Sequence, residues 1–174
     1  IFENGYAANA MCAPSRASIM TGRYSTRFGF EFTPLFPGAL KLMEWIADTQ
    51  DDELKLEIEE HLYDDAKDVF SAGVPTEEIT IAEVLQDAGY YTAHIGKWHL
   101  GTAKEEFWPT NRGFETSYGH MTGGIGYFDH TAAGRLDWHR NESSLREEGY
   151  STELIADEAI NIIKNKDQSR PLFL

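Results

Sequence analysis

The clearest helical pattern of apolar and polar residues lies between Ile79 and Gly89. Within it, Thr80 and Glu83 match a capping box, in which a threonine and a glutamate three residues later close the first turn of a helix. Ile79 and Val84 stand at the positions of a hydrophobic staple around that turn. The pattern therefore predicts a short helix that ends at Gly89, where glycine supplies the backbone freedom that a helix end requires.

The segment from Tyr91 to Ile95 follows this helix directly. Its length and its aromatic and β-branched residues predict a short buried strand. Gly96 would then begin a loop at the carboxyl end of the strand. A helix, a strand and a loop in this order are typical of an open α/β sheet, whose ligands bind at the carboxyl ends of the strands.

The last part of the chain again pairs a helix with a strand. We expect a helix, capped by Ser151 or Thr152, from a stripe of apolar residues that should pack in the core: Leu154, Ile155, Ala159, Ile162 and Ile163. Residues 171–174 read as the start of a buried strand. The pattern as a whole predicts an α/β fold, a mostly parallel sheet flanked by helices, within a single domain over residues 1–174.

An acidic segment from Glu44 to Asp68 carries most of the charge. It has eleven acidic residues against two lysines, which is −9 of the formal net charge of −14. Amphipathic helices over about residues 40–75 are predicted by apolar residues at helical spacing: Met43, Ile46, Ala47, Leu54, Ile58 and Leu62. Such an insertion could form the rim of a substrate site or a surface excursion, and the usual behaviour of charged faces favours the excursion.

The composition describes a globular piece without a membrane span. With 174 residues and 41% hydrophobic content, the chain is long enough for one domain with its own core. No run of about eighteen apolar residues occurs, so no transmembrane segment is predicted. Cys12 is the only cysteine, which excludes an internal disulfide. The negative charge argues against nucleic acid as a partner.

The segment around Cys12 has the features of an anion site. Pro14 should open a short helix, because proline is favoured at the first helical position, and Thr21-Gly22 should end it. Unpaired N–H groups beside Cys12 would then favour negative charge. Arg16, one turn further on, carries a guanidinium that can bind two oxygens of a sulfate or phosphate. The alternative is a buried structural cysteine before a core helix.

Two polar residues follow the predicted strand. Lys97 and His99 would project from the loop after Gly96 into the crevice at the sheet edge. Lysine offers a compact positive charge for a tetrahedral dianion, and histidine can exchange a proton near neutral pH. The alternative is a surface lysine beside a histidine that stacks on Trp98. The cysteine segment upstream makes this alternative less favoured. His94, within the strand, is expected to pack in the core.

These segments resemble the signatures of the sulfatase family. Residues 10–22 contain Cys-x-Pro-x-Arg, and residues 89–101 contain Gly-Tyr-x-Thr followed by Gly-Lys-Trp-His. Further similarity to arylsulfatases, including N-acetylgalactosamine-4-sulfatase, lies in residues 109–115, 137–141, 148–152 and 170–174. The resemblance covers most of the chain apart from about residues 36–75. It implies the alkaline-phosphatase-like sulfatase fold.

The resemblance also implies a role for each signature residue. Cys12 would be oxidised to formylglycine, an aldehyde whose hydrate is the nucleophile, by a formylglycine-generating or anaerobic sulfatase-maturing enzyme that reads Cys12, Pro14 and Arg16. Arg16 would hold the nucleophile, Lys97 would neutralise charge on the sulfate, and His99 would assist its release. Calcium would be the divalent cation, and the modified Cys12 is the one metal ligand that the resemblance places in this chain.

Residues farther along form a second group of candidates. The candidate substrate-binding residues are Lys97, His130 and His139. Asp129 and Asp137 lie in the same glycine- and aromatic-rich stretch, where surface positions are the alternative. Arg112 and Gly113 are expected to fix the fold, because a turn glycine and a buried arginine often hold a loop.

The resemblance further implies that the chain is an internal fragment. The family places paired aspartates before the cysteine and an Asp-Asn pair later, and neither appears at those places in this chain. We therefore expect the N-terminal half of a catalytic domain, without its first strand and inactive alone. The expected substrate is a sulfated compound, most favourably a sulfated carbohydrate, in an extracytoplasmic location: periplasmic, secreted or lysosomal.

Three other functions stay open. Phosphonate monoester hydrolases and phosphodiesterases share the cysteine motif, although Lys97, Trp98 and His99 favour sulfate. A protein that keeps Cys12 as a thiol could bind sulfated glycans without catalysis. An unmodified cysteine hydrolase that uses His99 is the least favoured, because nothing marks a third residue to orient the histidine.

Overall fold

The computed structural model describes residues 3–34 and 71–174. The whole acidic segment lies outside these residues, so the amphipathic helices expected there stay a prediction. Within the described residues, none of the helices has the length and hydrophobicity that a bilayer crossing requires.

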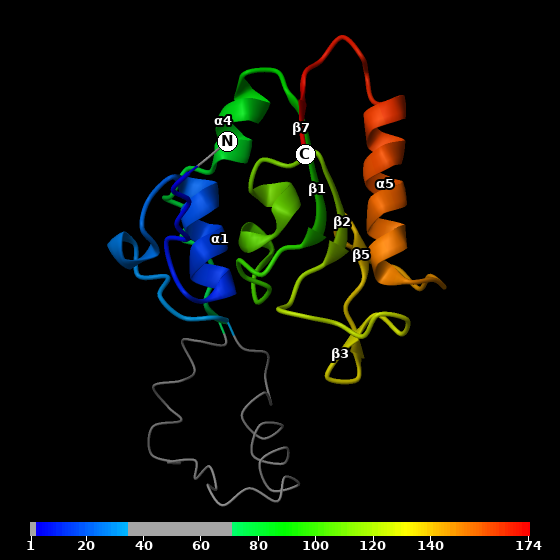
Figure 1. Ribbon diagram of the computed structural model, residues 1–174, viewed down its shortest axis with the longest axis horizontal. Helices are drawn as coiled ribbons and strands as arrows, with labels where there is room; N and C mark the ends of the chain where they lie inside the picture. The colour runs from blue at the N-terminus through cyan, green and yellow to red at the C-terminus, as the bar shows by residue number, and fades with distance from the viewer. Residues whose placement is uncertain (1–2, 35–70) are drawn as a thin grey trace, which may run out of the picture.

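A mixed, mostly parallel sheet forms the centre of the molecule, in the order β6-β5-β2-β1-β7 (Figure 1). β1 (Tyr91–Lys97) runs parallel to β2 (Thr116–His120) on one side and to β7 (Leu172–Phe173) on the other. β5 (His139–Arg140) and β6 (Ser143–Ser144) extend the sheet with antiparallel pairing. The predicted α/β sheet is confirmed, with an antiparallel edge that the sequence pattern did not indicate.

Helices lie on both sides of this sheet. α5 (Ser151–Asn165) packs against β1 and β2 from one side, and α1 (Cys12–Thr21) and α4 (Ile81–Asp87) lie on the other (Figure 1). Short 3-10 turns and a small hairpin complete the described elements: η1 (Ser25–Arg27), η3 (Glu105–Phe107), η4 (Pro109–Asn111), β3 (Thr131–Ala132) and β4 (Arg135–Leu136).

The capping box at the start of α4 is confirmed. The backbone N–H of Glu83 donates to Thr80 Oγ1 at 3.2 Å, and the backbone N–H of Thr80 donates to Glu83 Oε2 at 2.6 Å. Ile79 and Val84, the expected staple, are 68% and 54% exposed. This pair therefore faces solvent and adds nothing to the core.

The start of α5 differs from the prediction. Tyr150 is the N-cap, without a side-chain bond, and Ser151 is the first helical residue. Ser151 is buried, and its N–H donates to the carbonyl of Tyr127 at 2.9 Å, so tertiary packing replaces a local cap. Ile162 is buried as expected, but Ile163 is 52% exposed because it lies beside the buried stripe.

The core on the α1 side of the sheet joins three distant parts of the chain. Trp98 and Phe114 pack edge to face with ring centroids 5.9 Å apart, and Phe173 stacks on Phe114. The buried members of this core cluster are Ala13, Ala17, Phe30, Val74, Ala82, Trp98, Leu100 and Phe114. The cluster therefore fixes α1 against the segment that follows β1.

Arg112 and Gly113 have the structural role that was expected of them. The guanidinium of Arg112 is buried and donates to the carbonyls of Val74 at 2.8 Å and Glu78 at 2.5 Å. Gly113 has a φ of +88°, and a side chain there would collide with the backbone of Glu83. Together the two residues hold the segment before α4 against the turn before β2.

Strand β1 is two residues longer than the sequence predicts. Gly96 does not begin a loop, because it pairs with Gly119 of β2, and Lys97 pairs with His120. Gly119 has a φ of +135°, and a Cβ there would collide with the backbone of Gly96. This close approach of two glycines carries the parallel pairing to the edge of the sheet where the candidate site lies.

Candidate active site

The N-terminus of α1 presents Cys12 at the surface. Cys12 is the first residue of the helix and is exposed, so the alternative of a buried structural cysteine is wrong. Pro14 stands at the third helical position, two residues later than expected, where its missing N–H still costs no intrahelical bond. Gly22 ends the helix as predicted, with a φ of +67° and its N–H donating to Ser18 at 2.9 Å.

His99 meets Cys12 from the segment after β1. The Sγ of Cys12 lies 3.4 Å from Nδ1 of His99, whose side chain is almost completely buried. The backbone of His99 has a φ of +61°, in the left-handed region that non-glycine residues rarely adopt, and its N–H donates to Met121 at 3.0 Å. The fold thus holds His99 in an uncommon conformation that places its ring beside Cys12.

The surroundings of these two groups change their protonation. Partial burial would raise the pKa of Cys12, but the charge of Lys97, the N–H of Ala13 and hydrogen bonding to Lys97 outweigh it and lower that pKa. Burial, together with the positive charges of Lys97 and Arg16, lowers the pKa of His99 to about 4. Near neutral pH the site therefore holds a neutral imidazole beside a thiol that ionises more readily than usual.

Arg16 connects α1 to the end of β1. Its Nη1 donates to the backbone carbonyl of Lys97 at 2.6 Å. Burial lowers the pKa of Arg16, and the smaller opposing effect of the nearby Cys12 does not cancel this shift. The same carbonyl accepts a bond from Nε2 of His94 at 3.2 Å. The guanidinium thus has a structural contact in addition to the charge that it brings to Cys12.

His94 packs as the sequence predicts. Its ring contacts Trp98 edge to face at 5.1 Å, and burial lowers its pKa to about 4. His120, at the end of β2, was missed by the sequence analysis. It is buried, lies opposite Lys97 in the sheet register, and bonds through Nδ1 to the carbonyl of Thr122 at 3.0 Å. An assignment of residues 116–120 as a strand would have revealed it.

A small pocket of about 160 Å³ adjoins His99. It is lined by Thr33, Pro34, His99, Gly101, Thr102, Thr122, Gly123 and Gly124. Gly123 lies so close to the imidazole that a Cβ would be 2.8 Å from Cε1 of His99. Cys12, Arg16, Lys97 and His99 are therefore brought together at one edge of the sheet.

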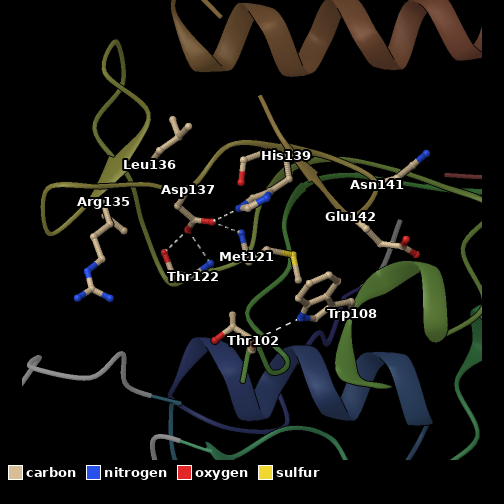
Figure 2. A pocket seen from close by; sticks show the side chains of 12 residues that line it. Thr102, Trp108, Met121, Thr122, Arg135, Leu136, Asp137, His139, Asn141 and Glu142 are labelled. Carbon is tan, nitrogen blue, oxygen red and sulfur yellow. Dashed lines mark hydrogen bonds and ion pairs between the residues drawn. The ribbon is translucent and has the colours of Figure 1, made fainter. Parts of the chain in front are cut away.

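Asp137 and His139 lie in a neighbouring, larger pocket (Figure 2). Asp137 accepts bonds from the backbone N–H groups of Met121 and Thr122, both at 2.9 Å, and from the Thr122 hydroxyl. His139 Nε2 lies 3.0 Å from Asp137 Oδ1. Burial alone would raise the pKa of Asp137, but these hydrogen bonds lower it to about 2.

The other two candidates of this stretch lie elsewhere. His130 is 1% exposed, stacks on Trp138 with centroids 4.6 Å apart, and bonds to the carbonyl of Gly149 at 3.1 Å. Its ring is thus used in packing, and we do not place it at the substrate surface. Asp129 is exposed and caps its own turn through Thr131.

The part of the chain that the structure describes contains no group of three or more His, Cys, Asp or Glu residues that could hold a metal ion. Cys12 is the only expected metal ligand within it. The described residues thus do not by themselves fit a divalent cation.

Comparisons with known proteins match the whole chain. The family model "Sulfatase" matches residues 1–174. Human N-acetylgalactosamine-6-sulfatase is 29% identical over 100% of the chain and 31% of its own length. The crystal structure of Ps i-CgsB in complex with k-i-k-neocarrahexaose is 26% identical with a TM-score of 0.70, over 97% of this chain and 34% of that one. The structure of BT4656 in complex with its substrate D-glucosamine-2-N,6-O-disulfate is 28% identical with a TM-score of 0.60, over 98% of this chain and 25% of that one.

These likenesses confirm the expected alkaline-phosphatase-like sulfatase fold. The chain spans about a third or less of the length of each of these relatives.

Proposed function

Because the chain belongs to the sulfatase family, we propose that the complete protein that contains it hydrolyses sulfate esters at the site around Cys12. The contact of 3.4 Å between Cys12 and His99 carries this proposal. It unites the two segments that were singled out from the sequence, with Arg16 and Lys97 beside them. In this proposal, residues 1–174 form part of a single catalytic domain, with the acidic segment as an insertion.

Cys12 acts in this mechanism after a maturation enzyme has converted it to formylglycine. One hydroxyl of the hydrated aldehyde loses its proton and attacks sulfur, the bond between sulfur and the ester oxygen breaks, and that oxygen takes up a proton to leave as the alcohol. The second hydroxyl then loses its proton, and the bond between its carbon and the sulfate oxygen breaks. Sulfate leaves, and the aldehyde is regenerated. The exposed position of Cys12 at a helix start supports this role, because both the maturation enzyme and an ester can reach it.

The neighbouring side chains supply charge and a proton acceptor. Lys97 and Arg16 stabilise the negative charge of the sulfate and of the nucleophile. His99 accepts the proton of the second hydroxyl, and the 3.4 Å contact between its Nδ1 and Sγ of Cys12 supports this role. The pKa of about 4 keeps the ring neutral near pH 7 and also makes it a weaker base than a free histidine. The family resemblance implies calcium, which would activate the nucleophile when bound.

The substrate in this proposal is a sulfated carbohydrate. Support comes from relatives, one named N-acetylgalactosamine-6-sulfatase and another bound to a disulfated glucosamine as its substrate. The arylsulfatase type that the sequence favours is the finer proposal, and it predicts turnover of simple aryl sulfates. An extracytoplasmic location completes the proposal and follows from the family resemblance.

Two measurements test this function. Mass spectrometry of the tryptic peptide that ends at Arg16, after co-expression with a maturation enzyme, should show the aldehyde at Cys12. The complete protein should hydrolyse an aryl sulfate faster than an aryl phosphate diester, and a Cys12→Ala variant should hydrolyse neither. An unmodified thiol would contradict the mechanism, and a preference for the phosphate diester would favour the phosphodiesterase alternative.

A further inference from the structure

A pocket of about 270 Å³ lies beside the His99 site and takes no part in the steps above. Thr102 and Trp108 form one wall, and residues of β4, β5 and the loop at Thr122 form the other (Figure 2). Thr102 and Thr122 also line the pocket that contains His99. The two pockets are therefore neighbours, so a ligand whose sulfate lies near His99 could extend into the larger one.

The larger pocket combines an aromatic wall with fixed polar groups. The indole N–H of Trp108 donates to the carbonyl of Thr102 at 3.1 Å, which fixes the plane of the ring. His139 is held by Asp137, and Asn141 and Glu142 stand at the same end as Trp108 (Figure 2). An aromatic face with hydrogen-bonding side chains around it is suited to a sugar, which has an apolar C–H face and a ring of hydroxyl groups.

The charges in this pocket point to an acidic sugar. Asp137 is satisfied by its donors, and Glu142 accepts a bond from Thr110 at 3.0 Å. Arg135, in contrast, is exposed and forms no ion pair with any residue in the described ranges 3–34 and 71–174. Its guanidinium lies at the end of the pocket away from Trp108 (Figure 2). Arg135 is the cationic side chain of this lining, and its guanidinium remains available to an anionic group of a ligand.

We propose that this pocket binds the sugar of the sulfate ester, with Trp108 against the ring and Arg135 on a second acidic substituent of the sugar. The assignment rests on the proposed function, because the position of the sulfate near His99 determines which part of the sugar reaches the larger pocket. It makes Arg135 a specificity-determining residue that selects sugars with two anionic groups. A guanidinium binds a sulfate or carboxylate through paired hydrogen bonds, which an alanine cannot replace.

The test measures binding rather than turnover. Calorimetry on the complete protein with Cys12→Ala, which cannot cleave the ester, would compare D-glucosamine-2-N,6-O-disulfate with D-glucosamine 6-O-sulfate. We expect roughly tenfold tighter binding of the disulfated sugar, a loss of that preference in Arg135→Ala, and part of it kept in Arg135→Lys. Arg146→Ala, an exposed arginine outside both pockets, is the matched control and should keep the full preference.

Trp108→Ala should weaken the binding of both sugars to a similar degree, and Trp108→Phe should restore most of the lost affinity. The assignment is overturned if the starting protein binds both sugars equally, or if Arg135→Ala keeps the preference. A wild-type protein that hydrolyses no sulfate ester would contradict the proposed function instead. The binding comparison distinguishes the two failures because it requires no catalysis.

Discussion

Cys12 and His99 are 87 positions apart in the chain, yet Sγ of one lies 3.4 Å from Nδ1 of the other. Their neighbours Ala13 and Trp98 belong to the same buried cluster. The distance is therefore set by core packing and not by the conformation of an exposed loop. Substitutions that loosen this core should weaken catalysis even when they touch neither residue.

Replacement of Cys12 by serine should stop the reaction after one turnover. A serine hydroxyl can take the sulfate but has no second hydroxyl with which to expel it. We expect Cys12→Ser to accumulate a sulfated protein, visible as a mass increase in the peptide that contains residue 12, while Cys12→Ala stays unmodified. Sustained turnover by the serine variant would show that the second hydroxyl is not needed.

Arg16→Lys should lower both stability and maturation. The lysine keeps the charge but loses the planar group that reaches the carbonyl of Lys97, and hydrogen bonds from charged groups contribute about 1.5–3 kcal/mol. Denaturant unfolding would measure the loss, and mass spectrometry would measure the fraction of formylglycine. Arg23→Lys is the control, because Arg23 is partly exposed and a lysine keeps the charge that pairs with Glu78, so stability should change by less than about 1 kcal/mol. Equal stability losses in the two variants would contradict the structural role of Arg16.

Stability should fall as the pH is lowered from about 6.5 to about 4. His94 and His99 have pKa values of about 4 in the folded protein, so in this window the unfolded chain, with histidines near 6.5, binds more protons. Each histidine contributes a slope of up to about 1.4 kcal/mol per pH unit. Unfolding free energies at pH 7.5 and 5 should differ less in His94→Gln than in the wild type. An unchanged difference would show that His94 titrates normally.

Asp137→Asn should disturb the segment behind His99. The carboxylate accepts two backbone bonds from Met121 and Thr122, and an asparagine turns one acceptor into a donor that opposes these N–H groups. We expect a loss of about 3 kcal/mol in unfolding free energy and a fall in kcat with aryl sulfate. Asp129→Asn, an exposed aspartate of the same stretch, should change neither. A fully stable and active Asp137→Asn protein would contradict this account.

Local chemistry made much of the fold predictable. Thr80 and Glu83 specify the start of α4 through bonds within one turn, and Gly22 specifies the end of α1. Longer-range features were not predictable in this way. The continuation of β1 through Gly96 depends on Gly119 of the neighbouring strand, and the start of α5 at Ser151 depends on Tyr127.

The same distinction applies to the candidate site. Cys12, Arg16, Lys97 and His99 were predictable because their spacing in the sequence resembles a known pattern. The dependence of His99 on Gly123 could not be predicted, because it arises only when the loop after β2 folds back onto the imidazole. The burial of His130 against Trp138 is likewise a property of tertiary packing.

The carbonyl of Lys97 accepts bonds from both Arg16 and His94, so the part of Lys97 that holds the architecture is its backbone. Any amino acid except proline that follows the same backbone path would offer the same oxygen. Mutagenesis at position 97 can therefore separate the electrostatic role of Lys97 from its structural role. A neutral side chain of similar length removes the charge beside Cys12 and leaves the contact between α1 and β1 in place.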